Sequence, residues 1–232
     1  PRMIFVNAQS DLFHKDVPDE FIARVFAVMA LTPRHTYQVL TKRHGRMRSL
    51  LRSDNFRPAV EDAMRGVVAA HRTERAWHKA WPLPNLWLGV SVEDQATADL
   101  RIPALLDTPA AVRWVSAEPL LGPVDLRLTV AVNEDCRGCS GLLSPAHEPG
   151  NHWAPGEWHG VDRVVVGGES GPGARPMHPD WARTLRDQCQ ATGVAFHFKQ
   201  WGEHGPAGRR VGRRAAGDLL DGRQHHEWPV SQ

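Results

Sequence analysis

The chain has 232 residues, of which 41% are hydrophobic and 23% are charged, and 28 basic against 26 acidic residues leave a net charge of +2. This composition excludes a mostly disordered chain, and no apolar run approaches the roughly 20 residues that a membrane-spanning helix needs. The three cysteines are too few, and odd in number, for a secreted disulfide scaffold, so we expect a cytoplasmic protein. The net charge alone does not require a polyanionic partner.

The same unit recurs along the chain: a short apolar strand, a polar loop and an amphipathic helix. The predicted strands are short and mostly apolar, which is typical of strands buried on both faces. The predicted helices carry apolar residues at helical spacing, and Pro18 and Asp94 suit a first turn and a cap. In chain order we predict strand 3–6, helix 18–31, strand 36–41, helices 43–51 and 58–71, strand 85–91, helix 94–106, strands 112–117 and 161–167, helix 179–192 and strand 194–200.

This alternation predicts an α/β fold with a parallel sheet and right-handed crossovers. The sheet is either open and doubly wound or curled as a (β/α) barrel, and the periodicity does not separate the two. A full barrel has about eight strands, so six predicted strands indicate a partial, TIM-like (β/α) barrel truncated at its N-terminus. The barrel domain spans 1–202 with an insertion at 127–160, and a basic Gly/Arg-rich tail at 203–232 is expected to be extended or partly mobile.

Polar residues gather where the predicted strands end, which is where parallel α/β folds carry their chemistry. The alternative is that such loops are solvated and need polar residues anyway, but three carboxylates and two lysines directly at strand ends favour a pocket. The candidate binding residues are Asn7, Ser10, Asp11, Lys42, Ser91, Glu93, Glu118, Gly167, Gly168, Glu169, Ser170 and Lys199.

The Gly-rich run at 166–173 follows a strand, and its glycines allow the backbone to approach a ligand closely. It is neither the dinucleotide fingerprint nor a Walker loop, and the alternative is a tight turn. Glu169 suits an amine or ribose hydroxyls better than a phosphate.

Two cysteines and two histidines in the insertion have the residue types of a tetrahedral zinc site, and two ordinary thiols in a flexible loop are the alternative. These candidate ligands are Cys136, Cys139, His147 and His152. Cys189 lies on an apolar helix stripe and is expected to be a buried structural thiol.

From Arg34 to Arg52 the chain has six basic and no acidic residues, and Arg209, Arg210, Arg213 and Arg214 follow in the tail. Together they predict a phosphate-binding face for nucleic acid, with an ordinary solvated helix as the alternative. No hydrolase motif is present.

Several motifs in chain order carry a family resemblance. They include Phe5-Val6-Asn7, Ser10-Asp11-Leu12-Phe13-His14, Leu40-Thr41-Lys42-Arg43, Gly89-Val90-Ser91-Val92-Glu93, Ser116-Ala117-Glu118-Pro119, Gly167-Gly168-Glu169-Ser170-Gly171 and Phe198-Lys199-Gln200-Trp201-Gly202. The chain resembles the uncharacterised phage-protein family named after gene products thirty-seven and sixty-eight, which is similar to radical S-adenosylmethionine (SAM) proteins.

The resemblance implies a partial (β/α) barrel, a [4Fe–4S] cluster and SAM, and an enzyme of unknown substrate once a cluster-binding N-terminus is present. The family's three-cysteine motif precedes the Phe-Val-Asn strand and is absent from this sequence, so this chain is not expected to hold the cluster. The resemblance also implies SAM contacts at Gly167, Gly168 and Glu169, and SAM or substrate contacts at Ser10, Asp11, Ser91 and Glu93. It assigns no catalytic residue. The alternative function is a non-catalytic nucleic-acid-binding or partner-interaction module with a zinc-stapled loop.

Overall fold

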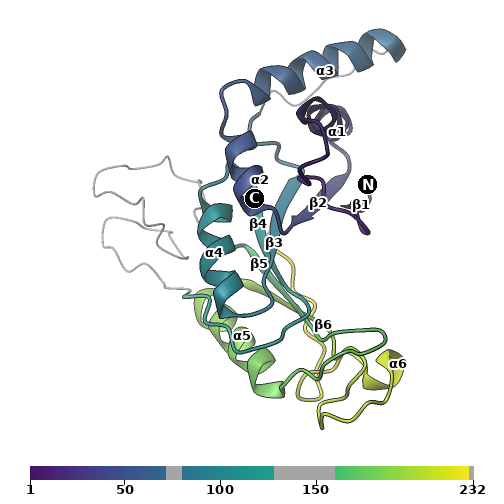
Figure 1. Ribbon diagram of the computed structural model, residues 1–232, viewed down its shortest axis with the longest axis vertical. Helices are drawn as coiled ribbons and strands as arrows, with labels where there is room; N and C mark the ends of the chain where they lie inside the picture. Colours follow the sequence, from purple (N-terminus) through teal and green to yellow (C-terminus); the bar gives the residue numbers. More distant parts are fainter. Residues whose placement is uncertain (72–79, 128–159, 230–232) are drawn as a thin grey trace, which may run out of the picture. The chain divides into compact units, whose positions relative to one another are not determined.

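Six strands form one sheet in the computed structural model, which describes residues 1–71, 80–127 and 160–229 (Figure 1). The strands are hydrogen-bonded in chain order, and the registers of β1 with β2, β2 with β3, β4 with β5 and β5 with β6 are parallel. A doubly wound sheet reverses its strand order at a switch point. The uninterrupted order of β1 (Met3–Val6), β2 (Thr36–Thr41), β3 (Leu86–Ser91), β4 (Val112–Ala117), β5 (Arg163–Gly167) and β6 (Ala195–Gln200) is therefore that of a partial barrel, as predicted.

Helices connect these strands, and the described chain divides into two compact units. Unit 1 comprises Pro1–Val90 with Asp107–Arg113, and unit 2 comprises Ser91–Leu106 with Trp114–Gln232. None of the helices in the described ranges has the length and apolar character that crossing a bilayer demands. The helices are α1 (Asp19–Leu31), α2 (His44–Leu51), α3 (Phe56–His71), α4 (Gln95–Leu106), α5 (Pro179–Thr192) and the short α6 (Arg213–Ala216).

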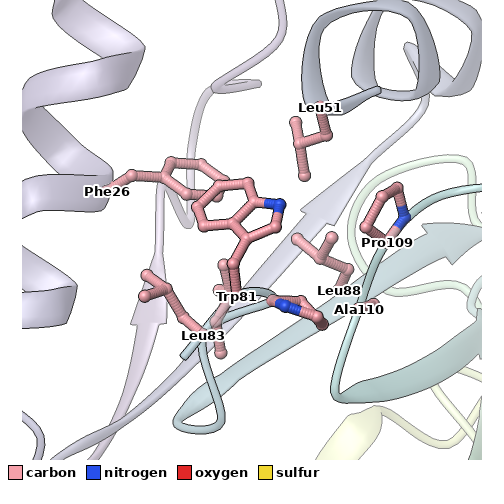
Figure 2. Close-up of a pocket in the computed structure, with 9 residues that line it drawn as sticks. Phe26, Leu51, Trp81, Leu83, Leu88, Pro109 and Ala110 are labelled. Atoms are coloured by element: carbon pink, nitrogen blue, oxygen red, sulfur yellow. The ribbon is translucent and has the colours of Figure 1, made fainter. Parts of the chain in front are cut away.

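The core of unit 1 centres on an aromatic cluster beneath α1, a helix that packs against α3. Pro18 takes an extended conformation as the N-cap, so the helix begins one residue later than predicted. The Phe26 ring meets the Phe56 ring edge-on, with 5.2 Å between centroids, and Trp81 lies 6.3 Å from Phe26. Figure 2 shows a small hollow beside Phe26 and Trp81 that is lined by apolar side chains and has no room for a water molecule. The hollow is a feature of core packing rather than a ligand site.

Unit 2 is built around β5, all five of whose residues are buried, and α5 packs against β5 and β6. The predicted cap of α4 is confirmed, because Asp94 Oδ1 accepts a hydrogen bond of 2.8 Å from the backbone N–H of Thr97. The predicted burial of Cys189 is also confirmed. It is fully buried on α5, and burial raises the pKa of its thiol to about 12.

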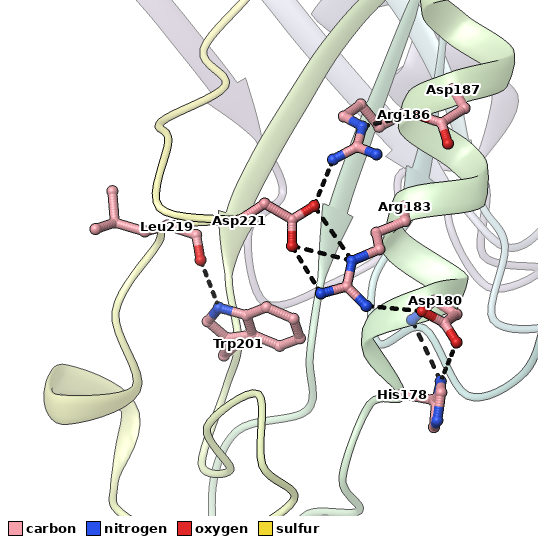
Figure 3. Close-up of polar contacts among 8 residues, drawn as sticks. All are labelled: His178, Asp180, Arg183, Arg186, Asp187, Trp201, Leu219 and Asp221. Atoms are coloured by element: carbon pink, nitrogen blue, oxygen red, sulfur yellow. Dashed lines mark hydrogen bonds and ion pairs between the residues drawn. The ribbon is translucent and has the colours of Figure 1, made fainter.

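Residues 203–229 fold back onto unit 2, so this part of the tail is not extended, and its partial mobility stays a prediction. Leu220 is fully buried, and the indole N–H of Trp201 donates to the carbonyl of Leu219 at 2.9 Å. Asp221 accepts hydrogen bonds of 2.7 Å from both Arg183 and Arg186 of α5, which lower its pKa to about 2 (Figure 3). The segment shows no periodic hydrophobic pattern, because single polar contacts between distant residues hold it in place.

Residues 225–227 of the same segment pair with the outer edge of β6. The backbone N–H of Phe198 donates to the carbonyl of His225 at 2.9 Å, and that of Glu227 donates to the carbonyl of Phe196 at 3.0 Å. His197 and His226 form an antiparallel bridge, and their rings stack with 4.7 Å between centroids. The edge of β6 is thus covered by the chain itself.

Candidate functional site

Asp11 ties the loop after β1 to the end of β2 in unit 1. Its Oδ1 accepts hydrogen bonds from the Thr41 hydroxyl at 2.7 Å and the Phe13 backbone N–H at 2.9 Å, and its Oδ2 accepts one from the Lys42 backbone N–H at 2.9 Å. The structure therefore brings Asp11 and Lys42 together, as expected of neighbouring strand ends. These bonds give the carboxylate a structural role, and ligand binding by either residue stays a prediction.

Asn7 and Ser10 shape the first turn of the same loop. Asn7 has φ of 60°, in the left-handed region that asparagine tolerates better than most residues. Its side-chain amide donates to the Ser10 hydroxyl at 2.8 Å, and the Ser10 backbone N–H donates to its carbonyl at 3.1 Å. The turn is thus defined by its own polar groups.

In unit 2, Arg101 of α4 joins Ser91 and Glu93 at the end of β3. One guanidinium nitrogen, Nη1, donates to the Ser91 carbonyl at 2.8 Å and to Glu93 Oε2 at 2.9 Å. The side chains of Arg101 and Glu93 are 15% and 12% exposed, so water screens this pair little. The pair holds the Glu93 carboxylate in place beside the end of β3.

Glu118, at the end of β4, pairs with Lys199 of β6 across 81 residues of sequence. Lys199 Nζ lies 2.9 Å from Oε1 and 3.1 Å from Oε2. The Glu118 side chain is 17% exposed and that of Lys199 is 54% exposed. A Cβ added to Gly167 would fall 2.7 Å from Glu118 Cγ, so a larger residue at this position would displace the Glu118 side chain.

Gly168 is needed for a similar close approach, to the loop after β6. A Cβ added there would fall 2.6 Å from the carbonyl carbon of Trp201 and closer still to its oxygen, and the Gly168 N–H donates to the Gln200 carbonyl at 2.9 Å. The chain's own packing thus explains both glycines, in keeping with a tight turn. That they also contact a ligand stays a prediction.

Glu169 forms a bidentate ion pair with Arg175, which lies on the far side of that turn. Arg175 Nε and Nη2 donate to its two carboxylate oxygens at 2.8 Å, and the Arg175 backbone N–H donates at 2.8 Å as well. These hydrogen bonds lower the pKa of Glu169 to about 2. The next residue, Ser170, accepts from the Gln200 side-chain amide at 3.1 Å.

Replacing Arg175 with glutamine is expected to return the pKa of Glu169 from about 2 toward its ordinary value of 4.5. Because folding depresses this pKa, the pair stabilises the native state above pH 4.5, and its contribution is lost as pH falls toward 2. A carboxyl-carbon NMR titration measures the change. Arg175→Lys keeps the charge without the planar fork, so an intermediate pKa is expected. A Glu169 pKa that does not move in Arg175→Gln would contradict this assignment.

Several contacts of these strand-end loops follow from no pattern in the sequence. Arg101 lies two helical turns beyond Glu93, a spacing too common to single it out. Glu203 lies beyond β6, where its N–H donates to the Glu169 carbonyl at 2.9 Å and its Oε1 accepts from the Gly171 N–H at 3.3 Å. Only the fold reveals these contacts.

Half of the cations in the basic segment from Arg34 to Arg52 form ion pairs with carboxylates of unit 1. Arg46 donates to the carbonyls of His14 and Val17 and to the Asp19 carboxylate. Arg48 and Arg52 both pair with Asp107. Three of the six cations therefore have a structural use, and nucleic-acid binding by this segment stays a prediction.

The predicted zinc ligands Cys136, Cys139, His147 and His152 lie outside the described residues. Within the ranges that the structure describes, no three His, Cys, Asp or Glu side chains are grouped to hold a metal ion. The described part also does not fit a [4Fe–4S] cluster, which cysteine thiolates hold. Its one cysteine, Cys189, is buried with a raised pKa and disfavours the thiolate form.

Comparison with known proteins gives a family but no characterised relative. No curated protein and no solved structure matches the chain. A family model described as "Protein of unknown function (DUF5131)" matches residues 1–229, and the chain therefore belongs to this family.

Proposed function

We propose that this chain is the SAM-binding part of a radical-SAM-like enzyme and that the strand ends of unit 2 bind the cofactor. One observation carries the proposal: carboxylates at three consecutive strand ends of this unit each face a cation of the same unit. The pairs are Glu93 with Arg101, Glu118 with Lys199 and Glu169 with Arg175. The family resemblance of the same residues supports it.

Alternating fixed charges suit a zwitterionic ligand. The amino-acid end of SAM carries an ammonium and a carboxylate, and hydrogen bonds between charged groups are the stronger kind in proteins. Glu118 is the acceptor for the ammonium, and Lys199, which is 54% exposed, is the donor to the carboxylate. The ligand replaces the internal pair without leaving either charge unmatched, which avoids the cost of an isolated charge.

Glu169 suits the ribose. A pKa near 2 keeps its carboxylate ionised at neutral pH, so it acts only as a hydrogen-bond acceptor. Ribose hydroxyls are donors, and the neighbouring Ser170 hydroxyl adds a further polar group on the same turn.

SAM supplies a hydrogen-abstracting radical in such enzymes when an iron–sulfur cluster reduces it. Because the described residues do not fit a cluster, the role proposed for this chain is to bind and orient SAM. A site on rigid strand ends positions a reacting group more closely than one on a free loop.

Isothermal titration with SAM tests the proposal. Loss of one charge-assisted contact costs about 1.5 to 3 kcal/mol, so Glu118→Gln and Lys199→Met are each expected to weaken SAM binding about tenfold or more. Glu61→Gln is the matched control, because it also removes a carboxylate paired with an arginine, on α3 of unit 1. Its affinity for SAM is expected to equal that of the wild type.

Adenosine serves as a ligand-side control because it lacks the amino-acid end. Glu118→Gln is expected to leave adenosine binding unchanged while weakening SAM binding, and circular dichroism checks that each variant is folded. Wild-type affinity for SAM in both Glu118→Gln and Lys199→Met would overturn the assignment.

A further inference from the structure

Residues 203–217 form an arginine-bearing arm on unit 2, here named the arginine hairpin. His204 and Arg210 make an antiparallel bridge, and the Gly205 N–H donates to the Arg209 carbonyl at 3.0 Å. The Gly208 N–H closes the turn by donating to the Gly205 carbonyl at 2.9 Å. The short helix α6 follows. Backbone hydrogen bonds therefore order this arm, although it contains no long element.

The arginine hairpin exposes a dense positive charge. All four arginines between 209 and 214 are exposed, and this stretch contains no acidic residue. Arg210 pairs with Glu203 at 3.5 Å, whereas Arg209, Arg213 and Arg214 make no ion pair with any residue that the structure describes. The nearby Asp218 lies 3.7 Å from His226 instead. Three cations within six residues therefore face solvent, in contrast to the engaged arginines of the segment from Arg34 to Arg52.

The base of the arginine hairpin is fixed to the loop that carries Glu169. Besides the two Glu203 contacts with that loop, Arg210 Nη2 donates to the Gly171 carbonyl at 3.3 Å. Gly202, with φ of +84°, approaches so closely that a Cβ added there would fall 2.7 Å from the Gly168 carbonyl carbon. The arm that bears these three guanidinium groups is therefore anchored to the loop that carries Glu169, within one unit.

We infer that the arginine hairpin binds the phosphate backbone of a nucleic acid and presents this substrate to the strand ends of unit 2. Several guanidinium groups on one arm match a ligand with repeated phosphates better than a small anion, because each phosphate takes its own donor. The order of the arm reduces the entropy lost on binding. The role of the nucleic acid as substrate rests on the proposed function, whereas the binding itself does not.

Fluorescence anisotropy with a labelled single-stranded oligonucleotide, in RNA and DNA forms, tests this inference. Each phosphate contact contributes about −0.7 to the slope of log affinity against log salt for single strands. The triple variant Arg209→Gln, Arg213→Gln, Arg214→Gln is thus expected to have a slope about 2 units shallower than the wild type. Between about 50 and 200 mM salt, wild-type affinity should fall about 20-fold more than that of the triple variant.

The matched control is Arg24→Gln, Arg57→Gln, Arg65→Gln, which changes the net charge equally on α1 and α3. It is expected to keep the wild-type slope. An equal slope for the triple variant and the wild type, or an equal loss in the control, would overturn the inference. Binding to phosphatidylglycerol vesicles but to neither oligonucleotide would overturn it in favour of a lipid surface.

SAM titration of the same triple variant separates this inference from the proposed function. Wild-type SAM affinity is expected, because the three arginines lie outside the carboxylate pairs. If no protein binds SAM but the salt slope still changes, the proposed function fails and the nucleic-acid surface stands as a binding module. If Glu118→Gln weakens SAM binding but the triple variant leaves the salt slope unchanged, the proposed SAM site stands and only the inference that the arginine hairpin binds nucleic acid is overturned.

Discussion

Gly168→Ala is expected to destabilise unit 2 by more than about 3 kcal/mol, at the upper end of the range for overpacking. The added methyl group would overlap the Trp201 carbonyl, which is backbone and cannot swing away as a side chain would. To relieve this overlap, the turn after β5 must move away from the loop after β6. That movement also breaks the hydrogen bond from the Gly168 N–H to the Gln200 carbonyl. Urea unfolding followed by circular dichroism measures the loss.

The control is the same substitution at Gly45 in α2, where an added Cβ meets nothing within 4 Å. Alanine has the higher helix propensity, so Gly45→Ala is expected to raise the free energy of unfolding by about 0.5 to 1 kcal/mol. Opposite signs for the two variants separate crowding from a general effect of losing glycine. A Gly168→Ala protein as stable as the wild type would show that the two loops are not packed as described.

Phe26→Ala is expected to lower the free energy of unfolding of unit 1 by about 3 to 5 kcal/mol, the usual cost of removing a buried phenyl ring. Phe26 is 1% exposed and contacts both Phe56 and Trp81. The adjoining hollow would grow into a larger cavity, because aromatic neighbours relax little into the space. Thermal and urea unfolding measure the effect.

Phe21→Ala on the same helix is its control. Phe21 is 45% exposed, so truncation should change the free energy of unfolding by only about 0.5 kcal/mol. Equal losses for the two variants would indicate that helix propensity, rather than core packing, decides the stability of α1.

Most of the fold could be predicted because strands buried on both faces have continuous apolar sequences, and the loops between them are polar. Strands β1, β2 and β4 begin and end where the pattern places them. One error in the predicted strand boundaries lies where a side chain at the strand end hydrogen-bonds elsewhere in the protein. Asn85 was predicted to begin β3, but its side-chain amide donates to the carbonyls of Met29 and His35 at 3.0 Å, and the strand begins at Leu86.

The candidate site was predictable only in part. Position after a strand identified the carboxylates Glu93, Glu118 and Glu169, because the strands themselves were recognisable. Their cationic partners follow from no local rule, since Lys199 meets Glu118 only through the order of β4, β5 and β6. The order of the arginine hairpin was missed for the same reason, because bridges and single hydrogen bonds leave no periodic trace in the sequence.

The pairing of residues 225–227 with β6 bears on the behaviour of the protein at high concentration. An uncovered edge strand offers a row of N–H and C=O groups that another molecule can extend into a continuous sheet. In unit 2 that row already bonds to the chain's own backbone at Phe196 and Phe198. The segment after β6 therefore prevents other molecules from pairing with this edge. A shortened variant that ends before His225 is expected to expose the edge of β6 and to aggregate more readily, even if its strand-end residues stay intact.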